Sequence, residues 1–249
     1  MRQLRALDSA IRSGDITFGF NADKNYAFTY GTGSGAPTSS LTLDKRRFVL
    51  AGSTAQSAGV ISINNNSSQA LTINTDLLGT ATVNRTLTLG GTGSGLSTFA
   101  GKISNGTIPT LNITKAGTGT WALSGTNSYT GLTNVSAGTL ALTGTNSGNS
   151  NITLNNNVTL AFNSGAALGA GSLLGQNGGN ANFGVGATFQ SMGSSPITIG
   201  LRTTGSGNGI RTGSNLDVNI KFTGTAAMTW NPEFNMVHPT KGSLGMTQE

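Results

Sequence analysis

The residues that could perform acid–base or nucleophilic chemistry are few and lie toward the two ends of the sequence. The acidic residues are Asp8, Asp15, Asp23, Asp44, Asp76, Asp217, Glu233 and Glu249, and the single histidine is His238. Residues 77–216 therefore contain neither a carboxylate nor a histidine. A glycosidase needs two carboxylates that flank one bond, and Ca²⁺ usually binds several oxygen ligands that include carboxylates. We therefore expect a protein that is not an enzyme and that uses no metal ion and no cofactor.

One remaining catalytic set would combine a serine with His238 from the C-terminal tail. Asp217 or Glu233 would have to complete a Ser-His-Asp arrangement, but a histidine that simply faces solvent explains this tail as well. The glycine-rich runs 31–35 and 91–95 lack the Lys-Ser/Thr ending of a phosphate-binding loop, and no helical pattern follows them. We interpret both runs as turns and assign no catalytic residue.

The composition limits the class of protein. Gly, Thr, Ser and Asn supply 127 of the 249 residues, while charged residues make up 9% and aromatic residues 6%. There is no Cys, which excludes a disulfide scaffold, and the glycines have no three-residue period with only 5 Pro, which excludes collagen. Apolar residues make up 35% of the chain, which argues against a highly charged disordered protein.

The charge pattern limits the class of partner. The formal net charge is +6, and the bases in the middle of the chain are isolated: Arg85, Lys102, Lys115, Arg202 and Arg211. Nucleic-acid-binding proteins typically carry a dense stripe of basic residues with aromatic side chains that stack on bases. We therefore expect no nucleic-acid partner, and we interpret these isolated bases as part of a thinly charged surface. No apolar run approaches the ~18 residues of a membrane span. A membrane would therefore be reached only through a missing or separate anchor.

Short alternating segments recur from about residue 41, separated by turns rich in Gly, Asn, Ser and Thr. They include Leu41-Thr42-Leu43, Leu71-Thr72-Ile73, Leu87-Thr88-Leu89, Leu111-Asn112-Ile113 and Ile152-Thr153-Leu154. In each triplet the two apolar side chains point inward and the polar one outward. Evenly spaced short strands fit an antiparallel sandwich or barrel, or a parallel solenoid. The solenoid is favoured, because small aliphatic side chains fill a thin coil and Asn-Gly hairpin turns are rare here.

This pattern predicts an all-β fold, a parallel β-helix, in three parts. Residues 48–230 form the β-helix, and residues 41–230 correspond to roughly 7–9 coils with three strands each. Residues 1–47 form an N-terminal cap or fragment edge. A short helix over residues 2–12 is possible there, because Leu4, Leu7 and Ile11 would share one face. Residues 231–249 form a C-terminal tail or cap.

The most specific pattern lies between residues 99 and 142. Residues 115–131 read KAGTGTWALSGTNSYTG and residues 133–140 read TNVSAGTL. This segment resembles the autotransporter passenger-associated β-strand repeat, and residues 99–106 resemble the stretch that often precedes it. The close resemblance covers about residues 96–162. The positions that carry the repeat are Gly117, Gly119, Trp121, Leu123, Gly125, Asn127, Tyr129, Gly131, Val135, Gly138 and Leu140.

The residues of this segment agree with the fold that the resemblance implies, a right-handed parallel β-helix. Trp121, Leu123, Val135 and Leu140 can fill the interior, while the glycines lie at bends. We expect Tyr129 to pack against the next coil, with a stacking platform for a sugar ring as the alternative.

The resemblance also implies export from a bacterium and a place on the cell surface, in association with the outer membrane, or outside the cell. The sequence shows no secretion signal, no terminal set of amphipathic barrel strands and no apolar sorting tail. We expect a fragment of a longer protein, with export by another polypeptide as the alternative.

The functional hypothesis from the sequence is a non-enzymatic, adhesin-like rod at the bacterial surface or secreted from the cell. Its partners would be surface glycans, matrix or other cells. The alternative is an extracellular fibre subunit that self-associates end to end, because strand edges at the ends of a β-helix can pair. Two further alternatives are a carbohydrate-active β-helix and an ice-binding face. The second would be built from the Thr-x-Thr pairs Thr80/Thr82, Thr86/Thr88, Thr118/Thr120, Thr143/Thr145 and Thr223/Thr225.

Overall fold

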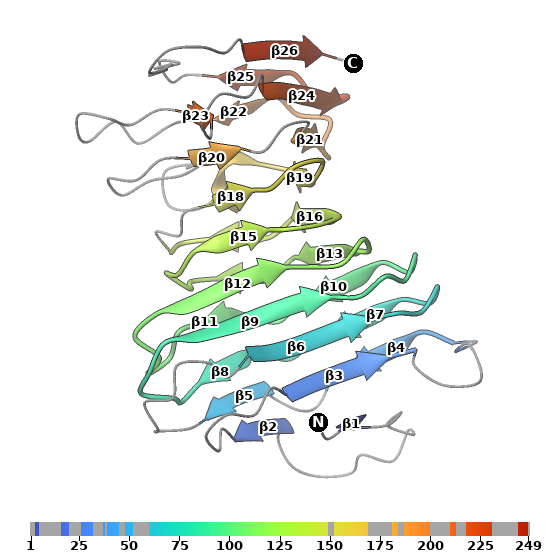
Figure 1. Ribbon diagram of the computed structural model, residues 1–249, viewed down its shortest axis with the longest axis vertical. Coiled ribbons are helices and arrows are strands. Elements are labelled where there is room, and N and C mark those ends of the chain that lie inside the picture. Colours follow the sequence, from blue (N-terminus) through green and yellow to red (C-terminus); the bar gives the residue numbers. More distant parts are fainter. Residues whose placement is uncertain are drawn as a thin grey trace.

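The chain forms a stack of short parallel strands in the computed structural model (Figure 1). The residues that the structure describes are 3–4, 16–19, 26–31, 37, 39–44, 48–51, 60–148, 152–168, 181–183, 187–199, 210–212, 218–230 and 244–248. The paired strands run parallel in each of the five sheets. The all-β parallel β-helix expected from the alternating triplets is therefore confirmed.

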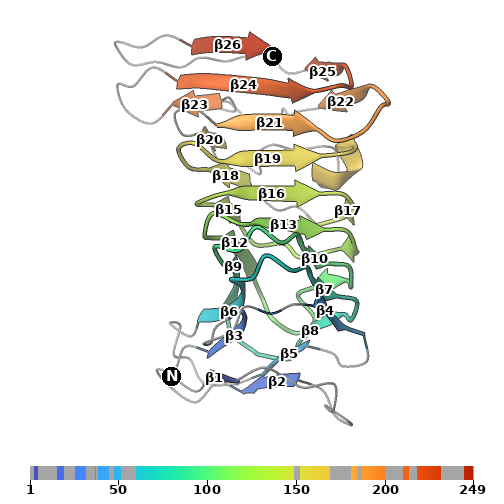
Figure 2. The same cartoon turned by 90° about the vertical axis from the view of Figure 1, so that its right-hand side faces the viewer.

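Two nine-stranded sheets form the long walls of the stack. The first contains β1 (Gln3–Leu4), β3 (Tyr26–Tyr30), β6 (Val60–Asn65), β9 (Arg85–Gly90), β12 (Leu111–Lys115), β15 (Thr133–Val135), β18 (Ile152–Leu154), β20 (Ala181–Phe183) and β23 (Ile210–Thr212). The second contains β4 (Leu41–Leu43), β7 (Leu71–Ile73), β10 (Ser97–Phe99), β13 (Thr120–Leu123), β16 (Thr139–Leu142), β19 (Thr159–Phe162), β21 (Thr188–Ser191), β24 (Val218–Gly224) and β26 (Leu244–Gln248). Figure 2 shows the strands of the second sheet lying one above the other.

Shorter sheets contribute further strands beside these walls. A four-stranded sheet contains β2 (Ile16–Gly19), β5 (Phe48–Ala51), β8 (Leu77–Gly79) and β11 (Ile103–Ser104). Two strand pairs join β14 (Thr126–Asn127) to β17 (Thr145–Asn146), and β22 (Ile197–Ile199) to β25 (Met228–Trp230). The one helical element of the described residues is the 3₁₀ turn η1 (Gly165–Leu168). No helix in the described part of the chain has the length and apolarity required to cross a membrane.

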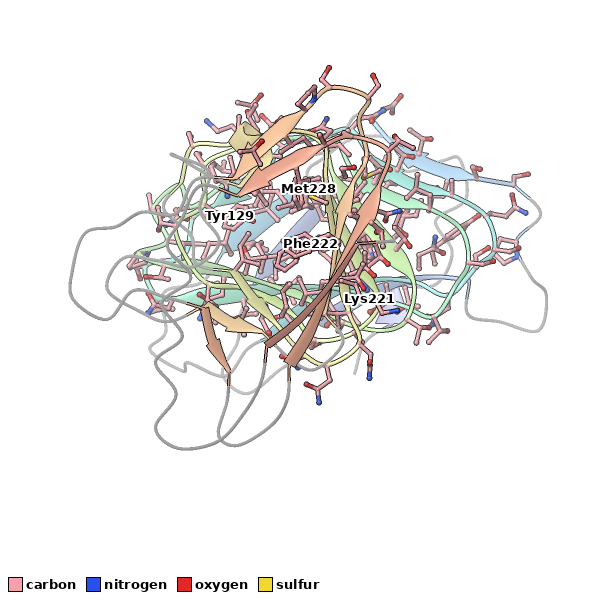
Figure 3. The ribbon with its side chains drawn as sticks, turned by 90° about the horizontal axis from the view of Figure 1, so that it is seen from above. Tyr129, Lys221, Phe222 and Met228 are labelled. Atoms are coloured by element: carbon pink, nitrogen blue, oxygen red, sulfur yellow. The ribbon has the colours of Figure 1, made fainter. Side chains whose placement is uncertain are left out.

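The core lies inside the stack because alternate residues of each strand point inward. In the first sheet, Leu87 aligns with Ile113 and Ile113 aligns with Thr133, so residues of one face form columns along the stack. Most inward positions are aliphatic and almost fully buried. Aromatic rings fill both ends of the core: Phe48 contacts Phe28 and Phe99, and Phe189 stacks on Phe222 with ring centroids 5.7 Å apart. In the view along the stack, Phe222 points into the middle and Lys221 lies toward the outside (Figure 3).

Coils of two lengths follow one another in this stack. In the first sheet, Ile63 aligns with Leu89 and Leu89 aligns with Lys115, so these two coils are equal in length. Lys115 then aligns with Val135 and Val135 with Leu154, and these partners lie closer together in the sequence. The two coils that end at Lys115 are therefore longer than the two that follow it, and the coil from Leu154 to Phe183 is long again. At the level of Lys115, the four-stranded sheet that ends at β11 gives way to the β14–β17 pair.

The stack also extends beyond the boundaries drawn from the sequence. Strands β1 to β4 lie within residues 1–47, the segment expected to be a cap, and they pair in parallel with later strands. Gln3–Leu4 form a strand, not a helix, and the rest of the helix expected over residues 2–12 lies outside the described residues. In the tail, β26 pairs in parallel with β24. Strand pairing thus includes residues of both segments that the sequence had suggested to be caps, an edge or a tail.

Candidate functional site

The repeat segment lies in the middle of the stack, in and around strands β12 to β16. Four of its apolar positions, Trp121, Leu123, Val135 and Leu140, are buried in the core. Trp121 also donates a hydrogen bond from Nε1 to the carbonyl oxygen of Gly90 in the preceding coil, at 2.8 Å. A tryptophan fits this buried position because its indole N–H finds an acceptor. These four side chains therefore hold successive coils together.

The glycines of the repeat lie where the backbone turns between sheets. Gly117 and Gly138 have φ angles of 70° and 66°, in the left-handed region that side chains other than glycine rarely adopt. Gly119, Gly125 and Gly131 lie against the backbone of the preceding coil, and a Cβ atom at Gly125 or Gly131 would meet the carbonyl oxygen of Gly101 or Leu111. The repeat therefore uses glycine to allow bends and close contact between coils.

Asn127 forms a buried polar contact between two coils. Its Oδ1 accepts a hydrogen bond from the Ile103 backbone N–H at 3.0 Å, and its Nδ2 donates to the Gly125 carbonyl oxygen at 3.2 Å. Asn146 aligns with Asn127 in the β14–β17 pair and is also buried. Because buried backbone groups need partners, these amide side chains complete hydrogen bonding at the third side of the coil.

Tyr129 is enclosed by the protein and cannot serve as a platform for a sugar ring. Its side chain is 1% exposed and belongs to the main hydrophobic core. Its hydroxyl lies 3.0 Å from Oγ1 of Thr133 on β15. The sugar-stacking alternative is therefore wrong, and packing against the next coil stays a prediction that this burial agrees with.

Two of the mid-chain bases are buried, so the expectation that they all lie on a thinly charged surface is wrong for them. Arg85 and Lys115 are 2% and 0% exposed, whereas Lys102 is exposed. Arg85 Nη1 donates to the carbonyl oxygen of Asn84 at 3.3 Å. Burial lowers the pKa of Arg85 from its usual value and lowers the pKa of Lys115 to about 8, because a charged group loses hydration inside the protein.

Lys115 Nζ is surrounded by backbone carbonyl oxygens. It donates to Ala116 at 2.9 Å, to Gly117 at 2.7 Å and to Ala137 at 3.0 Å. A lysine ammonium has three donors, so these three acceptors use all of them. The sequence contained a signal for this position, because the alternation Leu111-Asn112-Ile113-Thr114-Lys115 places the lysine on the inward face.

The threonine pairs considered for ice binding do not form a continuous double row. Thr86 and Thr88 both lie on β9, but Thr86 aligns with Asn112 and only Thr88 aligns with another threonine, Thr114. Thr80 and Thr82 lie beyond the end of β8, away from these strands. These pairs therefore do not build the regular face that this hypothesis required.

The acidic residues and the histidine considered for catalysis lie mostly outside the described residues. Asp217, Glu233 and His238 lie outside the described residues. Asp76 is exposed, and its Oδ1 accepts a hydrogen bond from the backbone N–H of Lys102 at 2.7 Å. Within the described ranges, no cluster of three or more His, Cys, Asp or Glu side chains could hold a metal ion.

The stacked parallel sheets define the class of this protein as a parallel β-helix. Within it, residues 113–142 match the family described as passenger-associated-transport-repeat, PATR. The match covers β13 to β16 and lies inside the wider segment, residues 96–162, that resembles this repeat in sequence. No curated protein and no solved structure matched the chain. The repeat indicates an autotransporter-passenger-associated β-helical module and suggests a secreted or cell-surface location.

Proposed function

We propose that this chain is a non-enzymatic structural module with an adhesin-like role at the bacterial surface. The observation that carries the proposal is that the residues of the repeat have structural roles. Its apolar residues lie in the core, its glycines lie in turns, and Asn127 forms a hydrogen bond between two coils. The segment that matches the PATR family thus builds the rod. The lack of any carboxylate or histidine between residues 77 and 216 supports a role without catalysis.

The surface chemistry favours uncharged partners. Residues 77–168 include three charged residues, Arg85, Lys102 and Lys115, and only Lys102 is exposed. Hydroxyl and amide groups form a row on the outward face of the first sheet, at Thr88, Thr114, Asn134 and Thr153. Contacts through such groups suit neutral surface glycans better than nucleic acids or strongly acidic polymers, which require a basic surface.

A binding and turnover assay tests this proposal. The intact chain would be immobilised on beads and presented with a panel of neutral and acidic polysaccharides, with the urea-unfolded chain as control. We expect retention of neutral glycans by the folded chain and no release of shortened or unsaturated products. Hydrolysis or elimination that a point mutation abolishes would overturn the non-enzymatic role. Failure of the folded chain to retain any glycan would overturn the glycan-binding role.

End-to-end self-association stays a prediction from the sequence. Electron microscopy of the purified chain at high concentration tests it directly. Filaments would support a fibre subunit, and a monodisperse monomer would argue against one.

A further inference from the structure

The turns that connect the first sheet to the second change length at Lys115. Aligned inward positions bound each turn: Ile63, Leu89, Lys115 and Val135 on the first sheet, and Leu71, Ser97, Trp121 and Leu140 on the second. The turns between them are residues 64–70, 90–96, 116–120 and 136–139. The first two turns are therefore equal in length, the third is shorter and the fourth is the shortest.

Turns of equal length stack in register through their backbones. In the two long turns, residues 64–70 and 90–96, the Gly93 N–H donates to the Asn65 carbonyl oxygen at 3.0 Å and the Gly95 N–H to the Ser67 carbonyl oxygen at 3.2 Å. Both donors have the same sequence separation from their acceptors, so the pairing continues through the turn without a shift. Parallel stacking pairs these two carbonyl groups through the backbone, and Asn65 Nδ2 donates to two more, those of Gln69 at 2.9 Å and Gly95 at 3.4 Å.

The shorter turns do not match in this way. Gly138 faces Gly117, Thr118 and Gly119 together, since a Cβ atom there would lie 2.6 to 2.7 Å from all three carbonyl oxygens. The outer ends of the two turns still pair, with the Ser136 N–H donating to Lys115 O at 2.9 Å and the Thr139 N–H to Gly119 O at 3.5 Å. The central carbonyl groups of the turn at residues 116–120 thus have fewer backbone donors above them than the equal turns provide.

Side chains provide donors at this mismatch. Lys115 Nζ donates hydrogen bonds to the carbonyl oxygens of Ala116 and Gly117 in the turn that follows it, and to that of Ala137 in the next turn. Trp121 Nε1 donates to the carbonyl oxygen of Gly90 in the preceding long turn, residues 90–96. Two inward side chains of one coil therefore supply four hydrogen bonds to three successive turns.

We propose that Lys115 and Trp121 form a coil-length adaptor, in which side-chain donors replace the backbone hydrogen bonds that turns of unequal length cannot make. The adaptor allows the two longer coils that end at Lys115 to be followed by two shorter coils without buried, unpaired carbonyl groups. The next two turns, residues 136–139 and 155–159, also differ in length, but no buried side-chain donor is invoked there. Asn155, Asn156 and Asn157 are exposed there, so that turn projects its extra length toward solvent.

This adaptor is independent of any ligand and joins the longer coils that end at Lys115 to the shorter coils that follow it in one cooperative unit. In a stacked-repeat protein, stability depends on each interface between neighbouring coils. Without the lysine donors, the interface between the turns at residues 116–120 and 136–139 would open locally while the rest of the stack stays folded.

Amide hydrogen exchange of the intact chain tests the adaptor. In Lys115→Met, which keeps the length of the side chain but has no donor, we expect roughly tenfold faster exchange at residues 116–121 and 136–140, since buried carbonyl groups left without a donor destabilise the closed turns. Lys102→Met is the matched control, because Lys102 is exposed, and its exchange should equal that of the unmodified chain. Unchanged exchange of the two turns in Lys115→Met would overturn the adaptor.

A turn insertion separates an adaptor from an ordinary buried donor. One glycine inserted after Gly138 gives residues 116–120 and the following turn equal lengths. We expect Lys115→Met to raise exchange severalfold less in this background, because backbone donors then reach the central carbonyl groups. An equal effect in both backgrounds would overturn the adaptor. Should these variants not fold, ¹⁵N NMR of the unmodified chain tests the adaptor. Slow exchange of the Lys115 Nζ protons with water would support hydrogen bonding to the three carbonyl oxygens, and fast exchange would contradict it.

Discussion

The Nζ atom of Lys115 lies 3.0 Å from the carbonyl oxygen of Ala137, a residue of the following coil. The same inward column holds Leu89 one coil earlier and Val135 one coil later. A cation thus takes a position that its neighbours fill with aliphatic side chains. Three backbone carbonyl groups accept hydrogen bonds from it and stabilise its charge, and the interval from residue 77 to 216 has no carboxylate that could pair with it.

Stability should depend on pH through Lys115. Burial lowers the pKa of this lysine from 10.5 to about 8 in the folded chain. Between these values the unfolded chain binds more protons than the folded chain, so the free energy of unfolding rises with pH across this interval. The rise should reach at most about 3 kcal/mol.

Urea unfolding from pH 7 to pH 10.5 measures this rise, with Lys115→Met as the reference. The difference between the two chains removes the contribution of every other titrating group. A constant difference over this pH range would show that the ammonium group is as well stabilised in the folded chain as in water.

The indole hydrogen bond of Trp121 should contribute measurably to stability. Trp121→Phe keeps a ring at this buried site but leaves the Gly90 carbonyl oxygen without its donor. We expect a loss of about 1–3 kcal/mol in the free energy of unfolding. Chemical denaturation measures it, and Leu96→Ala, at an exposed position, serves as control. Equal stability of Trp121→Phe and the unmodified chain would contradict a role for this bond.

The glycines with positive φ should tolerate alanine poorly. Gly117→Ala and Gly138→Ala place a side chain in the left-handed region and against the carbonyl groups of the preceding coil. Each should lower the free energy of unfolding by about 1–3 kcal/mol. Gly193→Ala is the matched control, because the nearest atom to its added Cβ would lie 3.5 Å away. Thermal unfolding that ranks the three variants equally would refute this explanation.

Asn127 should be more sensitive to substitution than an outward asparagine on the following strand, β15. Asn127→Ala removes an acceptor for the Ile103 N–H and a donor for the Gly125 carbonyl oxygen, both in buried surroundings. The expected cost is about 2–4 kcal/mol, as for two buried groups left unpaired. Asn134→Ala, at a half-buried outward position of β15, should cost less than about 0.5 kcal/mol. A similar cost for both in urea unfolding would mean that the Asn127 contacts contribute little.

Much of the fold was predictable because strand alternation in this sequence is regular. Triplets such as Leu111-Asn112-Ile113 place two side chains inward whichever coil they belong to. The stack was missed before residue 41, because the charged residues of the N-terminal segment suggested a cap in place of the strands β1 to β3.

The buried bases show where two rules of sequence interpretation compete. The alternation of β9 and β12 places Arg85 and Lys115 inward, but the general cost of burying charge argues for the surface. The alternation prevailed because backbone carbonyl groups at a turn can accept the ammonium protons of Lys115. Those acceptors depend on the lengths of neighbouring turns, which become comparable only once the register of the strands is known.

The distance between two spin labels tests most directly whether the repeat is one layer of a continuous parallel stack. Thr72 and Gln190 lie in one outward column, linked through Thr98, Ala122, Ala141 and Ala161. Because the chain has no Cys, labels can be attached only at Thr72→Cys and Gln190→Cys. Five strand spacings of ~4.8 Å predict a narrow distribution centred near about 24 Å by pulsed electron spin resonance. A broad distribution centred beyond about 40 Å, as for a flexible chain, would contradict the stack.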